Sequence, residues 1–240
     1  MQEGPDLEAQ REMQESVSPA EARTTQERFH PLDAAIGVLI HPVAAMRRIA
    51  AARPWAIALL LSMGIALLQA LAGLTSPLPG TDANPELPPG TGDIPLQGLV
   101  EGIRSPVGIA LQVLVATPVL LLLGTGVLYL LGRLLGGRGP FSALLSTLSF
   151  AEMPYVLLAP LTAWLNLAGS VFPFLGGLIG LGFSIWTMVL AVIGIRESLA
   201  LSTGRAMATL LIPVLAIFVL ATFLAILVAI LTVGAFFSMQ

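Results

Sequence analysis

Five long apolar runs are the feature that most limits what this chain can fold into. They lie at residues 55–74, 106–131, 142–165, 172–195 and 209–236. Each is long enough to cross a bilayer, which takes about 20 residues. Hydrophobic residues make up 56% of the chain and charged residues 10%, which is unlike a soluble protein. The chain is therefore predicted to be an all-α polytopic membrane protein, a bundle of five transmembrane helices.

The basic residues, all arginine, are distributed unevenly between the two sides of these runs. Those before the first run and in the loops after the second and fourth runs are Arg11, Arg23, Arg28, Arg47, Arg48, Arg53, Arg133, Arg138, Arg196 and Arg205. The opposite side has Arg104 alone. Since loop arginines favour the cytoplasm, we expect a cytoplasmic (inner) membrane protein with its N-terminus in the cytoplasm and its C-terminus outside. No cleavable signal peptide is visible, so the first run is expected to be the signal anchor.

The segments outside the runs differ in character. Residues 1–30 are acidic and poor in large apolar side chains, and are predicted to be a disordered cytoplasmic tail. Residues 31–53 are predicted to form an amphipathic interfacial helix that Pro42 breaks or kinks. Its apolar face would comprise Ile36, Leu39, Ile40, Val43, Met46 and Ile49. Residues 54–240 would be the five-span membrane domain, with an external Pro/Gly-rich loop at 75–105. The candidate membrane-surface contacts are Arg47, Arg48, Arg53, Arg138 and Arg205.

Polar residues recur at three- to four-residue spacing on the third run. They are Ser142, Ser146, Ser149, Glu152, Tyr155, Thr162 and Asn166. In a regular helix these positions share one face. A charge at the bilayer centre costs roughly 2.5 kcal/mol or more, so this face is expected to contact other helices or a wet cavity. All but Ser142 form our candidate intramembrane polar site.

Glu152 has no arginine, lysine or histidine in any run to pair with. We therefore expect a neutral carboxylic acid that hydrogen-bonds to backbone carbonyls or to Gln112, Thr117, Trp186 or Thr187. Two interpretations remain open. Glu152 is part of a proton relay or polar substrate site, or it is a protonated side chain that holds helices together. The second is favoured, because no other titratable side chain accompanies Glu152.

The sequence contains no arrangement typical of an enzyme or a metal protein. Its two histidines, His30 and His41, both precede the first run, so a Ser–His–Asp triad cannot assemble within the runs. Cysteine is absent, and no His/Glu cluster suited to a metal is present. The glycine-rich turn at Gly136 lacks the lysine of a phosphate-binding loop. We expect no enzymatic activity, no cofactor, no metal and no nucleic-acid partner.

Small residues at four-residue spacing occur on the last two runs. They are Gly176, Gly180 and Ser184 on the fourth, and Ala221, Ala225 and Ala229 on the fifth. Such spacing lets helix backbones approach closely in lipid. Either set could mediate self-association or contact with a protein partner, although packing within one bundle is favoured.

Three stretches resemble the Yip domain family, the five-span membrane proteins related to Rab/Ypt-interacting proteins, in its prokaryotic form. They are His41-Pro42 through Arg48-Ile49 to Arg53-Pro54-Trp55; Gly136-Gly137-Arg138-Gly139-Pro140-Phe141, followed by Phe150 and Pro154; and Ile195 through Ser202-Thr203-Gly204-Arg205-Ala206. The likeness covers about residues 32–236. It implies a non-enzymatic scaffold or interaction protein in membrane organisation. The alternative is a small transporter or channel subunit that uses the polar residues around Glu152.

Overall fold

A computed structural model describes residues 30–76, 96–168 and 173–238 of the chain. The described residues form helices and no strand. Five helical stretches are long and apolar enough to cross a membrane: Trp55–Gly73, Pro106–Leu134, Phe141–Leu167, Leu175–Leu199 and Thr203–Val228. The prediction of an all-α membrane protein with five spans is confirmed. The predicted N-terminal tail and most of the predicted 75–105 loop lie outside the described residues.

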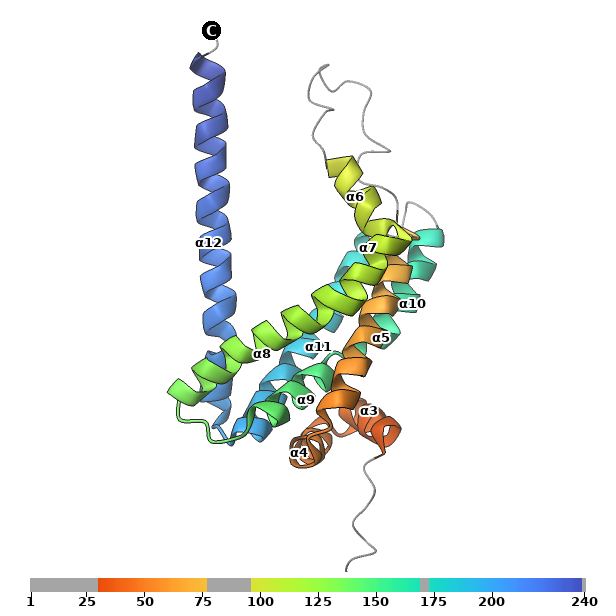
Figure 1. Cartoon of the computed structure of the whole chain (residues 1–240), viewed down its shortest axis with the longest axis vertical. Helices are drawn as coiled ribbons and strands as arrows, with labels where there is room; N and C mark the ends of the chain where they lie inside the picture. The colour runs from red at the N-terminus through yellow and green to blue at the C-terminus, as the bar shows by residue number, and fades with distance from the viewer. Residues whose placement is uncertain (1–29, 77–95, 169–172, 239–240) are drawn as a thin grey trace, which may run out of the picture. The chain divides into compact units, whose positions relative to one another are not determined.

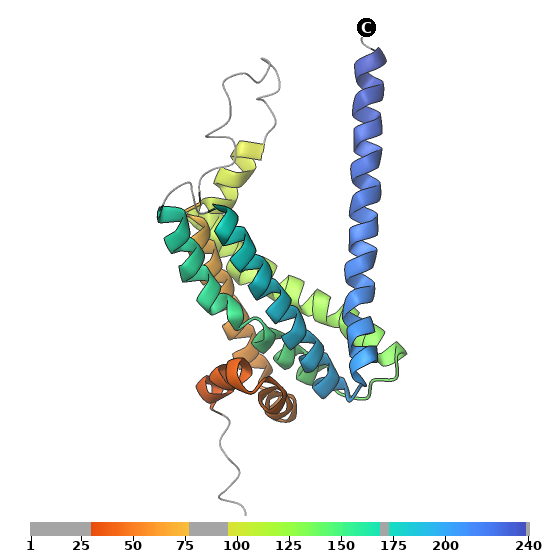
Figure 2. The same cartoon turned by 180° about the vertical axis from the view of Figure 1, so that it is seen from behind.

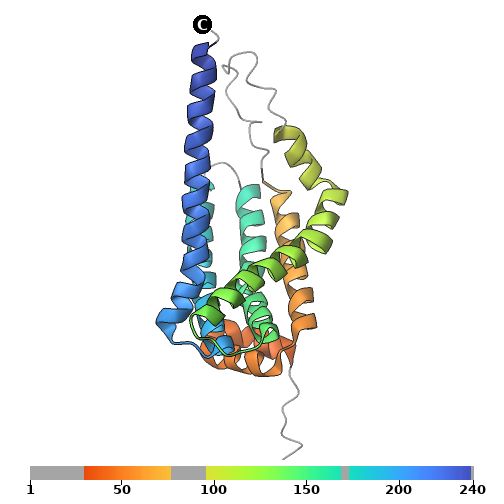
Figure 3. The same ribbon diagram turned by 60° about the vertical axis from the view of Figure 1, so that its left-hand side comes forward.

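Two short helices precede the first span. They are α3 (Pro31–Ile40) and α4 (Pro42–Ala52), and they meet at His41. Pro42 cannot continue a helix from α3, because it lacks an N–H, but it is well suited to the first turn of α4. Figures 1 and 3 show both helices lying across one end of the spans rather than along them. Arg53 ends α4 in a left-handed conformation, and the chain then turns into the first span.

The first two spans are joined by a segment of which the last part is helical. The first span is α5 (Trp55–Gly73), and α6 (Leu96–Arg104) lies within the stretch that the sequence suggested would be a loop. Arg104 Nη1 donates to the Ser76 carbonyl at 3.0 Å, so the end of α6 is tied to the residues that follow α5. The second span comprises α7 (Pro106–Leu111), the π-helical segment η1 (Gln112–Ala116) and α8 (Thr117–Leu134).

The π-helical segment has a local cause. Pro118 has no N–H to donate to the carbonyl four residues before it, so the regular ladder of hydrogen bonds is interrupted. The Thr117 N–H bonds instead to the Gln112 carbonyl, five residues back. Thr117 Oγ1 donates to the same carbonyl at 2.9 Å. The second span is thus continuous but irregular near its start.

The remaining spans are α9 (Phe141–Ala151) with α10 (Pro154–Leu167), then α11 (Pro173–Leu199) and α12 (Thr203–Ser238). The helix α9 contacts α4, α5, α8 and α11, whereas α10 contacts α5 and α11. Figure 2 shows α5, α10 and α11 side by side. The first part of α12 contacts α8 and α11, and from Leu215 to Val228 its side chains are exposed. This apolar stretch is suited to contact with lipid.

The protein core is built around α9. Eight of its eleven residues are buried, more than in any other span described. One cluster of the core joins Leu144 to Ile195, Leu199, Leu201 and Ala206. These residues come from α9, from the end of α11, from the connection that follows it and from the start of α12. The core therefore lies toward the end of the spans where α9 begins.

The turn between α8 and α9 packs directly against the end of α11. A Cβ at Gly139 would overlap the Ser198 carbonyl oxygen, so this position accepts only glycine without movement of the backbone. The Arg138 N–H donates to the Leu199 carbonyl at 2.9 Å. Gly136 has φ of 93°, a left-handed conformation that glycine adopts at no steric cost. The glycine-rich turn is thus held against the end of α11.

The apolar residues of 31–53 divide between two faces. Met46 and Ile49 on α4 are fully buried, and α4 contacts both α9 and α11. By contrast, Ile36 and Ile40 on α3 are 56% and 63% exposed. The residues of the predicted apolar face are thus split between two helices. Two of those on α4 pack on protein, whereas on α3 the buried residues are Ala35 and Val38.

Candidate functional site

The third span is broken at the position of its acidic residue. The helix α9 ends at Ala151, and α10 begins at Pro154. Between them the Glu152 N–H donates to the Ser149 carbonyl at 3.3 Å, and the Met153 N–H to the Phe150 carbonyl at 3.2 Å. Since Pro154 has no N–H, the regular ladder cannot continue through this point. The polar residues before and after the break therefore do not form one continuous helical face.

Glu152 lies beside Ser62 of α5 at this break. Ser62 is 1% exposed and its hydroxyl makes no hydrogen bond in the described structure, while the Glu152 carboxyl is close enough to interact with it. Ser62 shares the buried face of α5 with Ala58 and Ile65. The arrangement places a half-buried carboxyl and a buried hydroxyl between α5 and the broken span, at a depth midway along both.

Ser62 was not among the predicted partners of Glu152, which were backbone carbonyls and the side chains of Gln112, Thr117, Trp186 and Thr187. Gln112 and Trp186 are exposed. The Thr117 hydroxyl is engaged with a carbonyl of its own span. Thr187 is half-buried and its hydroxyl, like that of Ser62, has no partner in the described structure. A lone serine in an apolar run gave no signal that it would meet the glutamate.

The other polar residues of the third span differ in what they contact. Ser146, Ser149 and Thr162 donate to carbonyls of their own helices, at 2.8, 3.0 and 2.9 Å. Tyr155 is half-buried. Asn166 reaches another segment, because its Nδ2 donates to Thr75 Oγ1 at 3.3 Å and Ser76 Oγ at 2.9 Å. Asn166 thus links the end of α10 to the end of α5.

Thr147, which the polar pattern did not include, makes the contact between α9 and α11. Its Oγ1 lies 3.0 Å from the Leu144 carbonyl and 3.3 Å from the Gly194 carbonyl. A Cβ at Gly194 would stand 3.1 Å from that of Thr147. The close approach of the two helices therefore depends on a small residue on one side and a short hydroxyl on the other.

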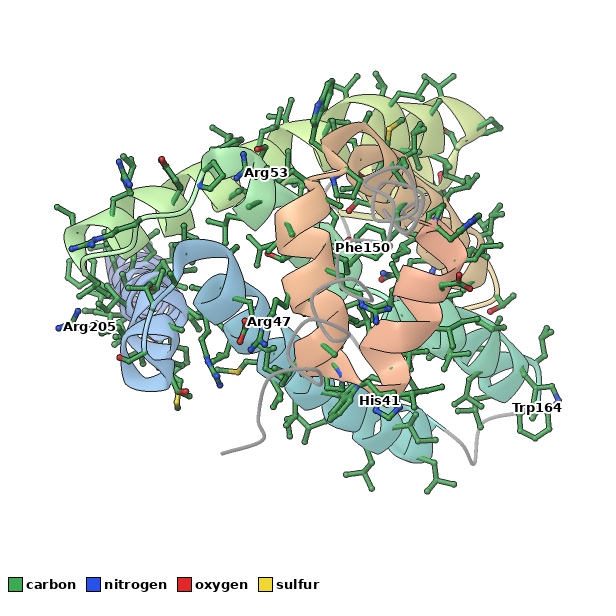
Figure 4. The ribbon with its side chains drawn as sticks, turned by 90° about the horizontal axis from the view of Figure 1, so that it is seen from below. His41, Arg47, Arg53, Phe150, Trp164 and Arg205 are labelled. Atoms are coloured by element: carbon green, nitrogen blue, oxygen red, sulfur yellow. The ribbon has the colours of Figure 1, made fainter. Side chains whose placement is uncertain are left out.

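An ion pair joins the short helices to the fourth span. Arg47 Nε on α4 lies 3.1 Å from Glu197 Oε2 on α11, and Arg196 Nε lies 3.5 Å from Glu197 Oε1. Figure 4 shows Arg47, from the middle of α4, directed toward α11, while Arg53 lies at the C-terminal end of α4. The side chains of Arg48 and Arg53 are exposed. Of the predicted membrane-surface contacts, Arg47 thus also has a contact within the protein.

Arg138 and Arg205 lie at the same end of the spans as α3 and α4. Arg138 is exposed in the α8–α9 turn, and Arg205 is exposed in the first turn of α12 (Figure 4). Arg205 Nη1 lies over Gly136, 3.3 Å from where a Cβ would stand. Arg133, which was not among the candidate site residues, reaches the same turn through a 3.3 Å bond to the Gly137 carbonyl.

The small-residue positions on α11 and α12 have different surroundings. A Cβ at Gly176 would contact Leu165 at 3.9 Å, whereas one at Gly180 would meet nothing within 4 Å. Ser184 is exposed and donates to the Gly180 carbonyl. Ala221 and Ala225 are exposed, and the side chain of Ala229 lies outside the described part. Gly176 therefore packs within the bundle.

In the described ranges, no three His, Asp or Glu side chains lie close enough together to hold a metal ion. The family model of the Yip1 domain matches residues 36–226, a range that runs from the middle of α3 through the first four spans and most of the fifth. No curated protein and no solved structure matches the chain.

Proposed function

Because the chain belongs to the Yip1 domain family, we propose that it is a non-enzymatic membrane scaffold. Its role would be to hold a protein or lipid partner at one face of the membrane. This face is the end of the spans that carries α3, α4 and the α8–α9 turn. Following the arginine distribution, we assign it to the cytoplasm and the protein to the cytoplasmic membrane, with the C-terminus outside.

The docking of α4 on the spans is the observation that carries this proposal. Met46 and Ile49 are fully buried, and α4 contacts α9 and α11. Glu197, whose side chain is 10% exposed, forms an ion pair with Arg47 of α4. A helix held by buried apolar side chains has a defined position, so its outer residues form a fixed surface. Such a surface suits recognition of a partner.

The outer face of α3 supports contact with lipid at the same surface. Leu32, Ile36 and Ile40 are spaced by four residues, which aligns them on one side of the helix. They are exposed by 76%, 56% and 63%. Exposed arginines follow on α4, at Arg48 and Arg53. Apolar side chains next to basic ones are typical of helices in the membrane interface.

Photo-crosslinking in intact cells tests the scaffold proposal. A photoreactive amino acid replaces Ala51, which is exposed on α4, or Leu181, which is exposed on the apolar span α11. We expect discrete protein adducts from position 51 and none from position 181. Glu197→Arg should reduce these adducts by displacing α4, and Arg47→Glu combined with Glu197→Arg should restore them. Adducts no more frequent at 51 than at 181 would reject the proposal.

A second candidate function, transport, is supported by the break at Glu152. Secondary transporters bind ions near the bilayer midplane, where discontinuous helices expose carbonyls and helix ends. The third span has such a discontinuity, with a carboxyl and the Ser62 hydroxyl beside it. Two apolar hollows lie elsewhere, along residues 106–115 and 215–223, and neither includes Glu152.

Flux measurements in proteoliposomes decide between the two functions. Transport through this site predicts proton flux above that of protein-free liposomes, and its loss in Glu152→Gln, which cannot ionise. The scaffold predicts no difference between the parent, Glu152→Gln and empty liposomes.

A further inference from the structure

Two arginines from different spans converge on the turn between α8 and α9. Arg133, in the last turn of α8, donates through Nη1 to the Gly137 carbonyl at 3.3 Å. Arg205, in the first turn of α12, places Nη1 over the adjacent Gly136. Arg138 follows in the same turn and is exposed. Three guanidinium groups thus belong to one short stretch of surface, which we call the arginine turn: Arg133, Gly136, Gly137, Arg138 and Arg205.

Arg133 is held in place by two contacts. Its guanidinium carbon lies 5.7 Å from the centre of the Tyr129 ring, a cation–π distance. Tyr129 packs edge-on against Phe141 with ring centres 5.7 Å apart. The bond to the Gly137 carbonyl uses one of the five donors of the guanidinium, and the other four donors have no hydrogen-bond partner among the described residues. A side chain fixed in this way loses little entropy when it binds a ligand.

The charges of the arginine turn are not balanced by acids in the part of the chain that the structure describes. The ion pairs there join Glu197 to Arg47 and to Arg196, and no such pair includes Arg133, Arg138 or Arg205. The start of α12 adds the partial positive charge of a helix N-terminus. Like charges held close together favour a bound anion.

Exposed apolar side chains flank the arginine turn. Leu134 follows Arg133 and is 81% exposed, and Met207, two residues after Arg205, is 45% exposed. Both belong to helices that continue as spans. A ligand with a negative phosphate and an apolar tail could therefore contact the arginines and the span surfaces at once. Guanidinium groups match phosphate oxygens through paired hydrogen bonds.

We propose that the arginine turn binds the phosphate of an anionic phospholipid, with the acyl chains along Leu134 and Met207. Basic sites at the ends of transmembrane helices are suited to such head groups. The proposal deepens the membrane-surface role proposed above, and rests on it only in placing the site in the cytoplasmic leaflet. The two can fail separately, because crosslinking at position 51 does not depend on a lipid at this turn.

Native mass spectrometry of the full chain tests the site. The protein is released from detergent containing equal amounts of phosphatidylglycerol and phosphatidylcholine, and the retained lipid is identified. We expect preferential retention of phosphatidylglycerol. Arg133→Gln and Arg205→Gln should each weaken its apparent affinity about fivefold, the scale of one arginine near an anionic lipid. Arg205→Lys, which keeps the charge but not the paired donors, should weaken it less than Arg205→Gln.

Arg53→Gln is the matched control, because it removes one exposed arginine from the same end of the spans. It should change the affinity by less than about twofold, because Arg53 lies at the end of α4 and is not part of the arginine turn, so any lipid that it contacts is bound at a separate place. Thermal unfolding without added lipid verifies that each variant is folded. If Arg133→Gln does not fold, the affinities of Arg205→Gln and Arg205→Lys for phosphatidylglycerol decide whether the site exists.

Three outcomes would overturn the proposal. Equal retention of phosphatidylglycerol and phosphatidylcholine would remove the anion preference. Equal affinity in Arg205→Gln and Arg53→Gln would place the lipid elsewhere. Complete displacement of phosphatidylglycerol by millimolar inorganic phosphate, on the scale of weak ionic binding, would assign the turn to a soluble phosphate instead.

Discussion

Arg47 and Glu197 are 150 positions apart in the sequence, yet Arg47 Nε and Glu197 Oε2 are 3.1 Å apart. This pair connects α4, which precedes all the spans, with the end of the fourth span. Glu197 is nearly buried, and Arg47 is 70% exposed. The ion pair therefore shows where α4 contacts the bundle. Most of the free energy that holds α4 there is expected to come from the buried side chains of Met46 and Ile49.

Alanine substitutions on α4 separate the contribution of the buried side chains from that of the ion pair. Met46→Ala and Ile49→Ala remove side chains that are fully buried, and each should lower the free energy of unfolding by about 2–5 kcal/mol. Arg47→Ala removes an exposed partner of an ion pair and should cost less than about 1 kcal/mol. Equilibrium unfolding in mixed micelles measures all three. A larger loss for Arg47→Ala than for Met46→Ala would contradict the buried position of α4.

The turn between α8 and α9 should be sensitive to a single methyl group. In Gly139→Ala the new Cβ would overlap the Ser198 carbonyl oxygen, and the variant should lose about 1–3 kcal/mol, the usual cost of overpacking. Gly64→Ala is the control, because nothing lies within 4 Å of its Cβ position. Alanine in a helix interior should leave stability unchanged or raise it by up to about 1 kcal/mol. Thermal unfolding in detergent distinguishes the two variants.

Glu152 is expected to connect helices through hydrogen bonds. Glu152→Gln keeps the shape and hydrogen-bonding capacity of the side chain, so its stability should be close to that of the parent. Glu152→Leu should lose on the order of 1 kcal/mol, the scale of an interhelical hydrogen bond in lipid. Both are measured by unfolding in detergent. If Glu152→Leu is as stable as the parent, Glu152 does not hold helices together.

Spans were predictable from the sequence because hydropathy is a local property. The five predicted runs correspond to the five observed spans, and Pro42 indicated the boundary between α3 and α4. The sequence could not show that other helices cover Met46, or that no helix covers Ile36. Helical periodicity identifies a face of a helix, but only tertiary structure determines what that face contacts.

The candidate site was less predictable. Pro154 indicated the break in the third span, but the regular spacing of polar residues before and after it suggested an unbroken helix. The contact between Ser62 and Glu152 joins different helices, and nothing in the run around Ser62 distinguishes that serine. The helix α6 was missed because the six prolines of residues 75–105 indicated an irregular loop, whereas all six precede Leu96.

The orientation in the membrane is expected to follow the arginines. A reporter that is active only outside the cytoplasm should be active when fused after Gln240 and silent when fused after Gly137. The reason is that ten of the eleven arginines lie on the side of Gly137. Reversed activities at the two fusion points would exclude a cytoplasmic assignment of α4 and the arginine turn.

Crosslinking of α4 to α11 in native membranes tests the central claim most directly. The chain contains no cysteine, so introduced pairs report without background. Arg47→Cys with Glu197→Cys should be joined efficiently by a short bifunctional thiol reagent. Arg47→Cys with Ser184→Cys should not, because Ser184 lies about 20 Å farther along the same helix. Equal crosslinking of the two pairs, or none in the first, would show that α4 is not docked on the fourth span.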